Sequence, residues 1–377
     1  MTQPDVHVCI ATGQNAANLI PLEQYAAQEV WILQTPSMRT RAGHLALALK
    51  REGRIVERLD FDDSGPVSMA LRAAEIAERL DGRRVVLHAT GGTKLMVLAL
   101  RDGLRYVEAG EGRLDILYAE TQRQQIDWLG AEARTDPMAD VLDLRQMLLV
   151  QGYRVEGDNR HAAAQQRAST RADVTREMGD NAARYGKFFS SLATLASRAV
   201  VGQSERDLTQ LFHYAPGGQS AVLMRKAHDK GLLRWDGEES VTFAGAEVAQ
   251  YFAGAWLEEF VLLKLAGMAR PGRFSSNLRV VSVDRNVPNE LDAVAVHRNR
   301  ALLIECKTGQ QAKAQDAIYK LAQLRQQLAG SVGSALYLSA QPVDDKVLQR
   351  AEEYKVDVLC GEGVGRLASW LREWQAR

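Results

Sequence analysis

The sequence of 377 residues has few cysteines and no long apolar run. Its three cysteines, Cys9, Cys306 and Cys360, are odd in number and far apart. They therefore predict neither a disulfide framework nor a metal cluster, and they favour a reducing, cytoplasmic location. No run approaches the roughly 18 apolar residues that a membrane span needs, so we expect no membrane segment. The N-terminus carries Asp5 and no basic stretch, so we expect no secretory signal peptide.

An excess of charge of one sign is missing as well, because 47 Lys and Arg residues balance 47 Asp and Glu residues. This balance argues against a protein that coats nucleic acid through bulk charge, but not against an enzyme that grips a strand locally. Arg270, Arg273 and Arg279 are a candidate local patch, with an ordinary solvated surface as the alternative. The length suffices for two or three domains, since single cores stop growing at roughly 250–300 residues.

Strands and helices alternate over the first segment, residues 1–134, which predicts a mostly parallel, doubly wound α/β sheet. The expected strands are Val6–Ala11, Glu29–Gln34, Ile55–Leu59 and Arg84–His88, followed by a closing pair, Leu114–Glu120 and Gln125–Leu129. The expected helices are Arg39–Glu52, Val67–Leu80 and one that follows Lys94 and continues to about Glu108.

A connector at 135–200 and a winged-helix-like domain at 201–245 are expected next. Ala162–Ala183 is polar without a clear apolar stripe, which predicts a surface helix or a mobile connector. Two short helices, Ser204–Tyr214 and Ser220–Lys230, precede a hairpin that ends with Ser240–Phe243, and this order is typical of a winged helix. We expect this domain to act as a spacer and dimer element, because Ser220–Lys230 carries few base-reading side chains.

The last segment, residues 246–377, predicts one long helix, three strands joined by short turns, and then alternating helices and strands. The helices are Ala246–Met268, Ala312–Leu328 and Asp344–Tyr354, and the strands are Leu278–Val283, Glu290–His297, Ala301–Lys307, Ser334–Leu338 and Val356–Leu359.

Two of these strands carry the strongest chemical signal in the sequence. Glu290 and Asp292 share one face of the first strand, and Glu305 and Lys307 share one face of the second, while Cys306 takes the opposite, core-facing side. A hairpin between the strands would bring two carboxylates and an ammonium group together. Carboxylate oxygens bind Mg²⁺ or Mn²⁺, and a lysine beside such an ion suits phosphodiester hydrolysis. The alternative is a solvated cross-strand ion pair.

The pattern Asp292 … Glu305-Cys306-Lys307 resembles the PD-(D/E)xK nuclease superfamily, although Leu291 stands where that motif has proline. The resemblance implies that Asp292 and Glu305 hold the metal ion and that Lys307 orients the attacking water. It also implies a carboxylate from the preceding helix, for which Glu258 is our choice and Glu259 the alternative.

A second candidate site follows the fourth expected strand, where Thr90-Gly91-Gly92-Thr93-Lys94 opens a helix. Glycines let a backbone approach a phosphate closely, and a helix start favours negative charge, although a plain helix cap is the alternative. The turn is neither a Walker loop nor a dinucleotide fingerprint. The loop that begins with Thr12, Gly13, Gln14 and Asn15 follows the first strand, and ligands of open parallel sheets collect at this edge.

With these two loops, the first segment resembles a CARF domain, the sensor of cyclic oligoadenylates in CRISPR defence. By domain order, nearly the whole chain resembles the CARF-nuclease effectors of type III systems. The resemblance implies a cytoplasmic homodimer that binds a cyclic oligoadenylate, cyclic tetra-adenylate foremost, and then cleaves DNA, RNA or both with Mg²⁺ or Mn²⁺. The rival hypothesis is a ligand-responsive winged-helix transcription regulator whose last domain is inactive.

Overall fold

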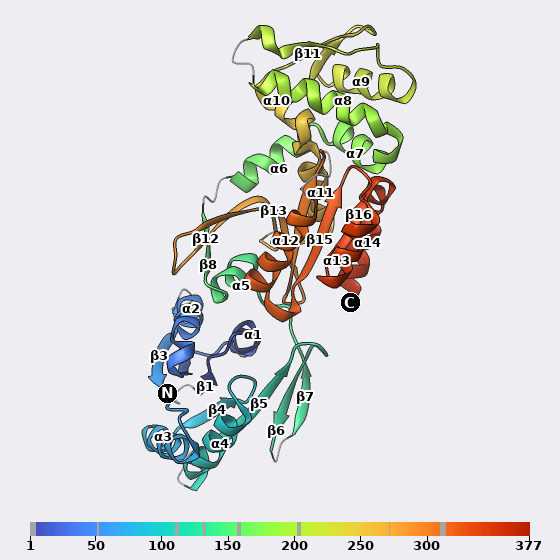
Figure 1. Cartoon of the computed structure of the whole chain (residues 1–377). Coiled ribbons are helices and arrows are strands. Elements are labelled where there is room, and N and C mark those ends of the chain that lie inside the picture. Colours follow the sequence, from blue (N-terminus) through green and yellow to red (C-terminus); the bar gives the residue numbers. More distant parts are fainter. Residues whose placement is uncertain are drawn as a thin grey trace.

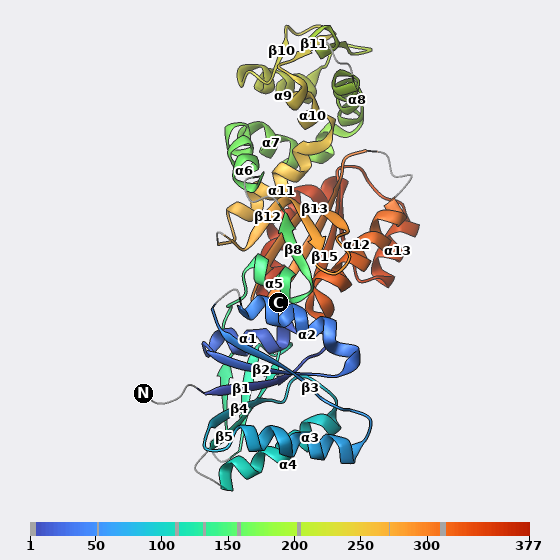
Figure 2. The same ribbon diagram turned by 90° about the vertical axis from the view of Figure 1, so that its left-hand side faces the viewer.

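The chain forms an elongated molecule of three parts, seen in a computed structural model (Figures 1 and 2). The structure describes residues 5–50, 53–109, 113–130, 133–156, 160–201, 205–270, 272–309 and 314–377. The N-terminal part lies at one end, the C-terminal sheet lies in the middle, and the unit built from residues 160–255 caps the other end. The prediction that the winged-helix region is a spacer between the other two parts was therefore wrong.

The N-terminal part is a doubly wound sheet, as predicted. Seven described strands lie in the order β3-β2-β1-β4-β5-β6-β7, with parallel pairing from β3 to β5 and antiparallel pairing beyond it. The strands are β1 (Val6–Ile10), β2 (Glu29–Gln34), β3 (Ile55–Asp60), β4 (Arg84–His88), β5 (Arg113–Glu120), β6 (Gln125–Leu129) and β7 (Arg134–Pro137). The helices are α1 (Ala16–Gln24), α2 (Arg39–Lys50), α3 (Pro66–Arg79) and α4 (Lys94–Ala109), with a short 3-10 turn η1 (Pro36–Met38).

Alternating side chains of β1 divide this part into two cores. Val6, Val8 and Ile10 face the cluster that α3 and α4 complete, whereas Cys9 faces the cluster on the side of α1 and α2. The second cluster continues without a break into the C-terminal part through α5 (Leu144–Val150), whose Met147 is fully buried. The two sheets are thus joined through a shared apolar core.

The C-terminal part contains a sheet with the order β16-β15-β14-β13-β12-β8 in the described residues. Its strands are β8 (Tyr153–Glu156), β12 (Phe274–Ser282), β13 (Pro288–His297), β14 (Arg300–Lys307), β15 (Ser334–Ser339) and β16 (Asp357–Cys360). The helices around it are α11 (Trp256–Ala266), α12 (Ala314–Leu328), α13 (Asp345–Glu353) and α14 (Leu367–Ala376), with 3-10 turns η4 (Gly330–Val332) and η5 (Gly361–Arg366). Strand β8 belongs to the predicted connector, yet it pairs with β12.

The remaining unit is mostly helical. It contains α6 (Arg160–Thr170), α7 (Ala172–Asp180), α8 (Ala182–Val201), α9 (Gly218–Asp229) and α10 (Ala246–Gln250), with η2 (Glu205–Leu208) and a sheet of β9 (Thr209–Leu211), β10 (Leu233–Trp235) and β11 (Ser240–Phe243). The helix predicted over Ser204–Tyr214 was wrong, because its described residues form η2 and β9. The stretch predicted to be a surface helix or mobile connector buries Val174 and Met178 in a core.

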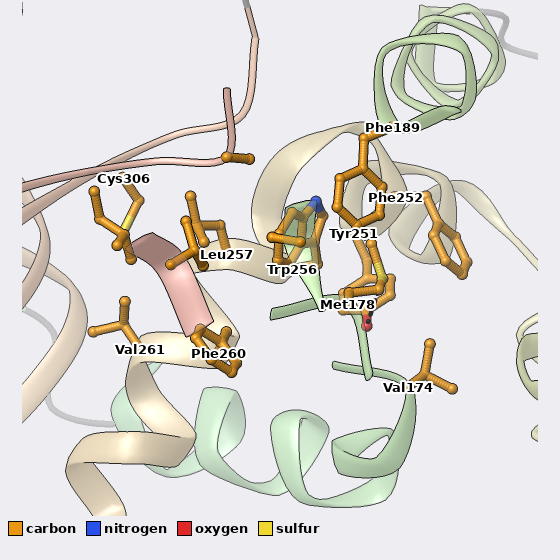
Figure 3. Packing of buried hydrophobic residues seen from close by; sticks show 14 of the residues in the cluster. Val174, Met178, Phe189, Tyr251, Phe252, Trp256, Leu257, Phe260, Val261 and Cys306 are labelled. Carbon is orange, nitrogen blue, oxygen red and sulfur yellow. Dashed lines mark hydrogen bonds between the residues drawn. The ribbon is translucent and has the colours of Figure 1, made fainter. Parts of the chain in front are cut away.

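A π-helical turn, η3 (Tyr251–Ala255), interrupts the long helix that the sequence predicts from Ala246 to Met268. The interruption centres on Gly254, where an added Cβ would lie 2.6 Å from the Thr308 hydroxyl oxygen. Glycine therefore lets the helix approach the end of β14. Beyond the turn, Leu257, Phe260 and Val261 of α11 gather near Cys306, and Trp256 packs beside Tyr251 and Phe189 (Figure 3). Cys306 thus faces the core, as expected.

In the ranges given above, no helix combines the length and the apolar character needed to cross a bilayer.

Candidate functional site

Asp292, Glu305 and Lys307 meet at one place on the C-terminal sheet. The Lys307 ammonium nitrogen lies 2.5 Å from Glu305 Oε1 and 3.7 Å from Asp292 Oδ2. The Glu305 side chain is buried, that of Asp292 is 17% exposed, and that of Lys307 is 43% exposed. The hairpin predicted from the sequence therefore brings the two carboxylates and the ammonium group together, at a place that solvent reaches from one side.

A local change in strand pairing creates this arrangement. Strands β13 and β14 pair from His297↔Arg300 to Ala293↔Ile304, and there the described pairing ends. Next along the strand, the Asp292 carboxylate accepts a hydrogen bond of 2.8 Å from the Cys306 backbone N–H. A side chain thus takes the place of a backbone acceptor, which fixes the orientation of the carboxylate.

The electrostatics are those of a crowded acidic site. Burial, together with the nearby negative charge of Glu305, raises the pKa of Asp292 to about 6. Burial alone would lower the pKa of Lys307, but its hydrogen bond and charge attraction to Glu305 outweigh burial and raise that pKa. Lys307 is therefore fully charged near neutral pH, and the cluster favours any further positive charge that enters it.

Glu258 and Glu259 of α11 have different surroundings. Burial, and then the charge of Asp292, raise the pKa of Glu258 to about 7, so Glu258 belongs electrostatically to the cluster. Glu259 instead accepts two hydrogen bonds from the buried guanidinium group of Arg171, one of 2.9 Å from Nε and a shorter one from Nη2. Our choice of Glu258 as the helix carboxylate stays a prediction, with this geometry in its favour.

Two residues near the cluster, Asn277 and Lys320, were not predicted from the sequence. Asn277 of β12 has a positive φ of 50° and hydrogen bonds to Glu258, which opposes the rise of its pKa. Lys320 of α12 lowers the pKa of Asp292 through its charge. Strand periodicity could not identify Asn277, since its backbone leaves the regular strand conformation, and no sequence signal marks Lys320.

The structure also bears on two other expectations, a basic patch of arginines and a solvated ion pair in place of the cluster. Arg273 and Arg279 do not form a free basic patch, because Arg273 donates to Asp140 at 2.8 Å and to the Leu142 carbonyl, and Arg279 lies 3.0 Å from Glu156. The carboxylates of Asp140 and Glu156 thus neutralise the charges of the two arginines. The alternative interpretation of the cluster, a solvated cross-strand ion pair, does not fit the burial of Glu305.

The carboxylates have the chemistry of a partial divalent-cation site, since Asp292 and Glu305 offer oxygen ligands in an environment that favours positive charge. In the described part of the chain, no group of three or more His, Cys, Asp or Glu residues has the spacing of a complete metal site. Mg²⁺ commonly binds through one or two carboxylates, with water and substrate phosphate oxygens completing its shell. Asp292 and Glu305 fit that mode, and the metal itself stays a prediction.

The two N-terminal loops lie side by side at the end of β1. A Cβ added at Gly91 would meet the Ile10 carbonyl oxygen at 2.2 Å, and Gly92 has φ +79° with the Ile10 side chain against it. Asn18 donates to the same Ile10 carbonyl at 2.8 Å. The glycines are therefore needed so that the Thr90–Lys94 turn can pack closely on β1. The sequence indicates the same two glycines for another reason, the close approach of a phosphate.

The polar side chains of the loops divide into two kinds. Thr90 accepts from the Ala119 N–H at 2.8 Å, and the Asn15 carboxamide oxygen accepts from the Thr12 N–H at 2.9 Å, so these groups hold the loops in shape. Thr93 accepts from the Met96 N–H at the start of α4. Lys94 and Gly13 are exposed. Lys94 therefore offers a charge beside a preformed turn, which suits a phosphate.

The first loop also reaches the C-terminal part. A Cβ added at Gly330, which has φ +63°, would lie 1.9 Å from Gln14 Oε1, so the Gln14 side chain rests directly on that glycine. Asn15 Nδ2 donates to the Arg41 carbonyl at 2.8 Å, and Arg41 Nη1 donates to the Gln151 carbonyl at 3.3 Å. The candidate ligand loop is thus in physical contact with elements that lead to the carboxylate cluster.

Known proteins resemble one segment of this sequence and the fold of the whole chain. Residues 246–377 match the family model of the Card1-like endonuclease domain. The fold of the whole chain is similar to protein VC1899 from Vibrio cholerae, with a TM-score of 0.83 and 21% identity over 99% of this chain and 98% of that one. No curated protein sequence matches the chain.

Two further structures resemble this fold. One is Can2 from Sulfobacillus thermosulfidooxidans in complex with cyclic tetra-adenylate, with a TM-score of 0.78 and 21% identity over 98% of this chain and 97% of that one. The other is a type III CRISPR defence DNA nuclease activated by cyclic oligoadenylate, with a TM-score of 0.61 and 18% identity over 100% of this chain and 52% of that one.

Proposed function

We propose that this chain, whose residues 246–377 form a Card1-like endonuclease domain, is a metal-dependent nuclease that a cyclic oligoadenylate activates in CRISPR antiviral defence. The observation that carries the proposal is the meeting of Asp292, Glu305 and Lys307 at a partly open place on the matched domain. The N-terminal loops, the likeness to Can2 with its bound cyclic tetra-adenylate, and the likeness to a cyclic oligoadenylate-activated DNA nuclease support the activator.

The order of β12, β13 and β14 between α11 and α12 supports a PD-(D/E)xK fold for this domain. The helix α9 and the β10–β11 hairpin support a winged-helix-like unit. We further propose a homodimer, because a ring of phosphates can be gripped from both sides by two identical loops related by a two-fold axis. These finer assignments complete the architecture that the sequence implied.

The roles of the residues follow from their positions. Asp292 and Glu305 would hold Mg²⁺ or Mn²⁺, with Glu258 assisting. The cation would polarise the phosphate and lower the pKa of a bound water. Lys307 remains protonated beside them, so it orients the water by donating hydrogen bonds and stabilises the charge that develops on the phosphate. The Cys306 N–H keeps the Asp292 carboxylate in place.

A plasmid assay tests the function. Supercoiled plasmid DNA and single-stranded RNA are incubated with the protein and Mn²⁺, with and without cyclic tetra-adenylate. We expect cleavage of at least one substrate that depends on both additions, and Asp292→Asn serves as the matched inactive control. Absence of cleavage with every combination, from protein that binds cyclic tetra-adenylate, would refute the nuclease.

A further inference from the structure

A groove of about 600 Å³ opens beside the carboxylate cluster. It runs between one face of α8 and the end of β14, where Thr308 and Gly309 directly follow Lys307. Its lining residues are Ser190, Ala193, Thr194, Ser197, Arg198, Val201, Ala253, Thr308 and Gly309. The volume lies within the roughly 300–1,000 Å³ of pockets that hold small organic ligands. The groove therefore borders the chain segment that follows Lys307, and it is large enough to receive part of a substrate.

The lining has the chemistry of a nucleotide site. Ser190, Thr194 and Ser197 recur at helical spacing on one face of α8 and are exposed, and Arg198 adds a permanent positive charge beside them. Hydroxyl groups and arginines are typical partners of sugar and phosphate. Between them, Ala193 and Ala253 offer small apolar surface, on which a base or sugar can lie without losing hydrogen bonds to water.

A second pocket, to which Glu258 of the cluster contributes, has a different charge. This pocket of about 480 Å³ is lined by four glutamates, Glu247, Glu258, Glu259 and Glu290. Its two arginines are already engaged, because Arg171 is bound by Glu259 and Glu247, and Arg167 lies 3.7 Å from Glu247. The four carboxylates outnumber the two guanidinium groups, so the pocket keeps a net negative charge that disfavours a phosphate. The chain of phosphates is thus directed toward the groove on the Lys307 side.

We propose that this groove holds the nucleotide next to the scissile phosphate of the substrate strand, and that Arg198 binds the phosphate on its far side. The inference rests on the proposed nuclease function and names the place where its substrate lies. The π-helical turn contributes directly, because Ala253 forms part of the wall, and Gly254 allows Thr308 to come close enough to line it.

Arg198→Gln tests the phosphate contact, and Arg184→Gln is its matched control, since Arg184 lies on the same helix but outside the groove. Binding of short single-stranded DNA and RNA oligonucleotides is measured by fluorescence anisotropy in the Glu305→Gln background with cyclic tetra-adenylate. Arg198→Gln should weaken binding roughly tenfold and reduce the slope of log K against log salt by about 0.7, the value for one lost phosphate contact on a single strand. Arg184→Gln should change neither quantity.

A second variant separates shape from charge. Ala193→Leu fills the groove and keeps every charge, so it should weaken binding without changing the salt slope, while its melting temperature stays at the wild-type value. In cleavage assays, both groove variants should raise KM and leave kcat within about a factor of two, because the reacting centre is intact.

The outcomes distinguish this inference from the function on which it rests. If wild-type protein cleaves but Arg198→Gln and Ala193→Leu retain its affinity and salt slope, the groove is not the nucleotide site, and the nuclease proposal stands. If wild-type protein with metal and activator does not cleave, the proposed function fails. If both variants behave as expected for DNA and RNA alike, the groove accepts a nucleotide of either sugar.

Discussion

His44 Nε2 lies 3.0 Å from Asp284 Oδ2, and this hydrogen bond joins the N-terminal domain to the turn that leads into β13. His44 is buried, and its imidazole ring packs against Gly152, where any added Cβ would lie 2.2 Å from the ring. The helix that carries His44, α2, is also the one whose Arg41 carbonyl receives the Asn15 side chain. A displacement of the candidate ligand loop at Thr12–Asn15 can therefore be transmitted through packed elements to β13, the strand that carries Asp292.

We first predict that Asp284→Ala weakens this coupling. Asp284 is partly exposed, so the variant should fold normally and bind cyclic tetra-adenylate as the wild type does. The factor by which the activator stimulates cleavage should fall roughly fivefold or more, which is the lower range of allosteric coupling. Stimulated and basal rates give the factor, and Arg285→Ala in the same turn is the control. Wild-type stimulation in Asp284→Ala would exclude this contact as the route.

Coupling also has to be reciprocal. A substrate that prefers the active arrangement must tighten activator binding by the same factor by which the activator tightens substrate binding. Calorimetry of cyclic tetra-adenylate binding to Glu305→Gln, with and without a non-cleavable single strand, should therefore give a higher affinity in the presence of the strand. Equal affinities would show that the two sites are independent, and the activation mechanism would have to be abandoned.

The carboxylate cluster gives the second prediction. Asp292→Asn and Glu305→Gln should abolish cleavage and leave activator binding intact, because each removes a negative oxygen ligand far from the N-terminal loops. EDTA should stop the wild-type reaction for the same reason. Plasmid nicking and calorimetry are the two measurements. A near wild-type rate in either variant, with metal present, contradicts the assignment of that residue.

The contrast between Glu258 and Glu259 gives the third prediction. Glu259→Gln leaves the buried Arg171 without its main partner, so the free energy of unfolding should fall by about 3 kcal/mol. Glu258→Gln should leave stability unchanged or slightly higher, since burial disfavours its charge and raises its pKa to about 7, yet cleavage should drop strongly. Urea unfolding and nicking assays measure both effects. The reverse pattern would make Glu259 the helix carboxylate.

The fourth prediction concerns the Thr90–Lys94 turn. Lys94→Ala should weaken cyclic tetra-adenylate binding roughly tenfold, as for the loss of one charge-assisted contact, and leave the maximal rate little changed. Arg101→Ala on the same helix is the control. Gly92→Val should be worse, because φ +79° strains a branched residue and its Cβ would lie 2.7 Å from Ile10 Cδ1. Unchanged affinity of Lys94→Ala in calorimetry removes Lys94 from the site.

A buried histidine pair, His7 and His88, gives the fifth prediction. His7 Nδ1 lies 2.9 Å from His88 Nε2, and burial, followed by the charges of Arg54 and Arg84, lowers the pKa of His7 to about 4. Between that value and the unfolded value of 6.5, the unfolded chain binds more protons, so stability falls as pH falls through this window. From about pH 7 to about pH 5 the loss due to His7 should be about 2 kcal/mol.

Urea unfolding at the two pH values measures that loss, and His7→Gln, which keeps a polar group near His88, should reduce it. An identical pH dependence in the wild type and the variant would show that His7 does not titrate as described. Because His88 is also shifted to a lower pKa by burial, part of the acid sensitivity should persist in the variant.

The sequence predicted the parts of the molecule that follow simple periodicity. The parallel sheet, the β13–β14 hairpin and the placement of Glu305 and Lys307 on one face were all deduced from alternating side chains and turn residues. The location of Cys306 in the core followed from the same alternation. Each of these depends on neighbours in the chain or on one adjacent strand, so local pattern was sufficient.

Features that depend on distant partners escaped prediction. Strand β8 looked like part of a connector because its four residues gain their role only by pairing with β12, more than a hundred residues later. The break at Gly254 depends on Thr308, and the structural use of Glu259 depends on Arg171. The helix predicted over Ser204–Tyr214 failed for the same reason, since β9 is stabilised by pairing with β11.

Strand β8 also bears on how this architecture can be divided in the laboratory or in evolution. A fragment that begins at residue 246 would match the family boundary, but it would expose the edge of β12 and leave Glu259 without Arg171. Unpaired sheet edges invite association with other chains. Such a fragment should aggregate, whereas one that begins ahead of α5 keeps both partners. Recombination that exchanges the C-terminal part among related proteins should accordingly use a border before α5, and not the point where the family match begins.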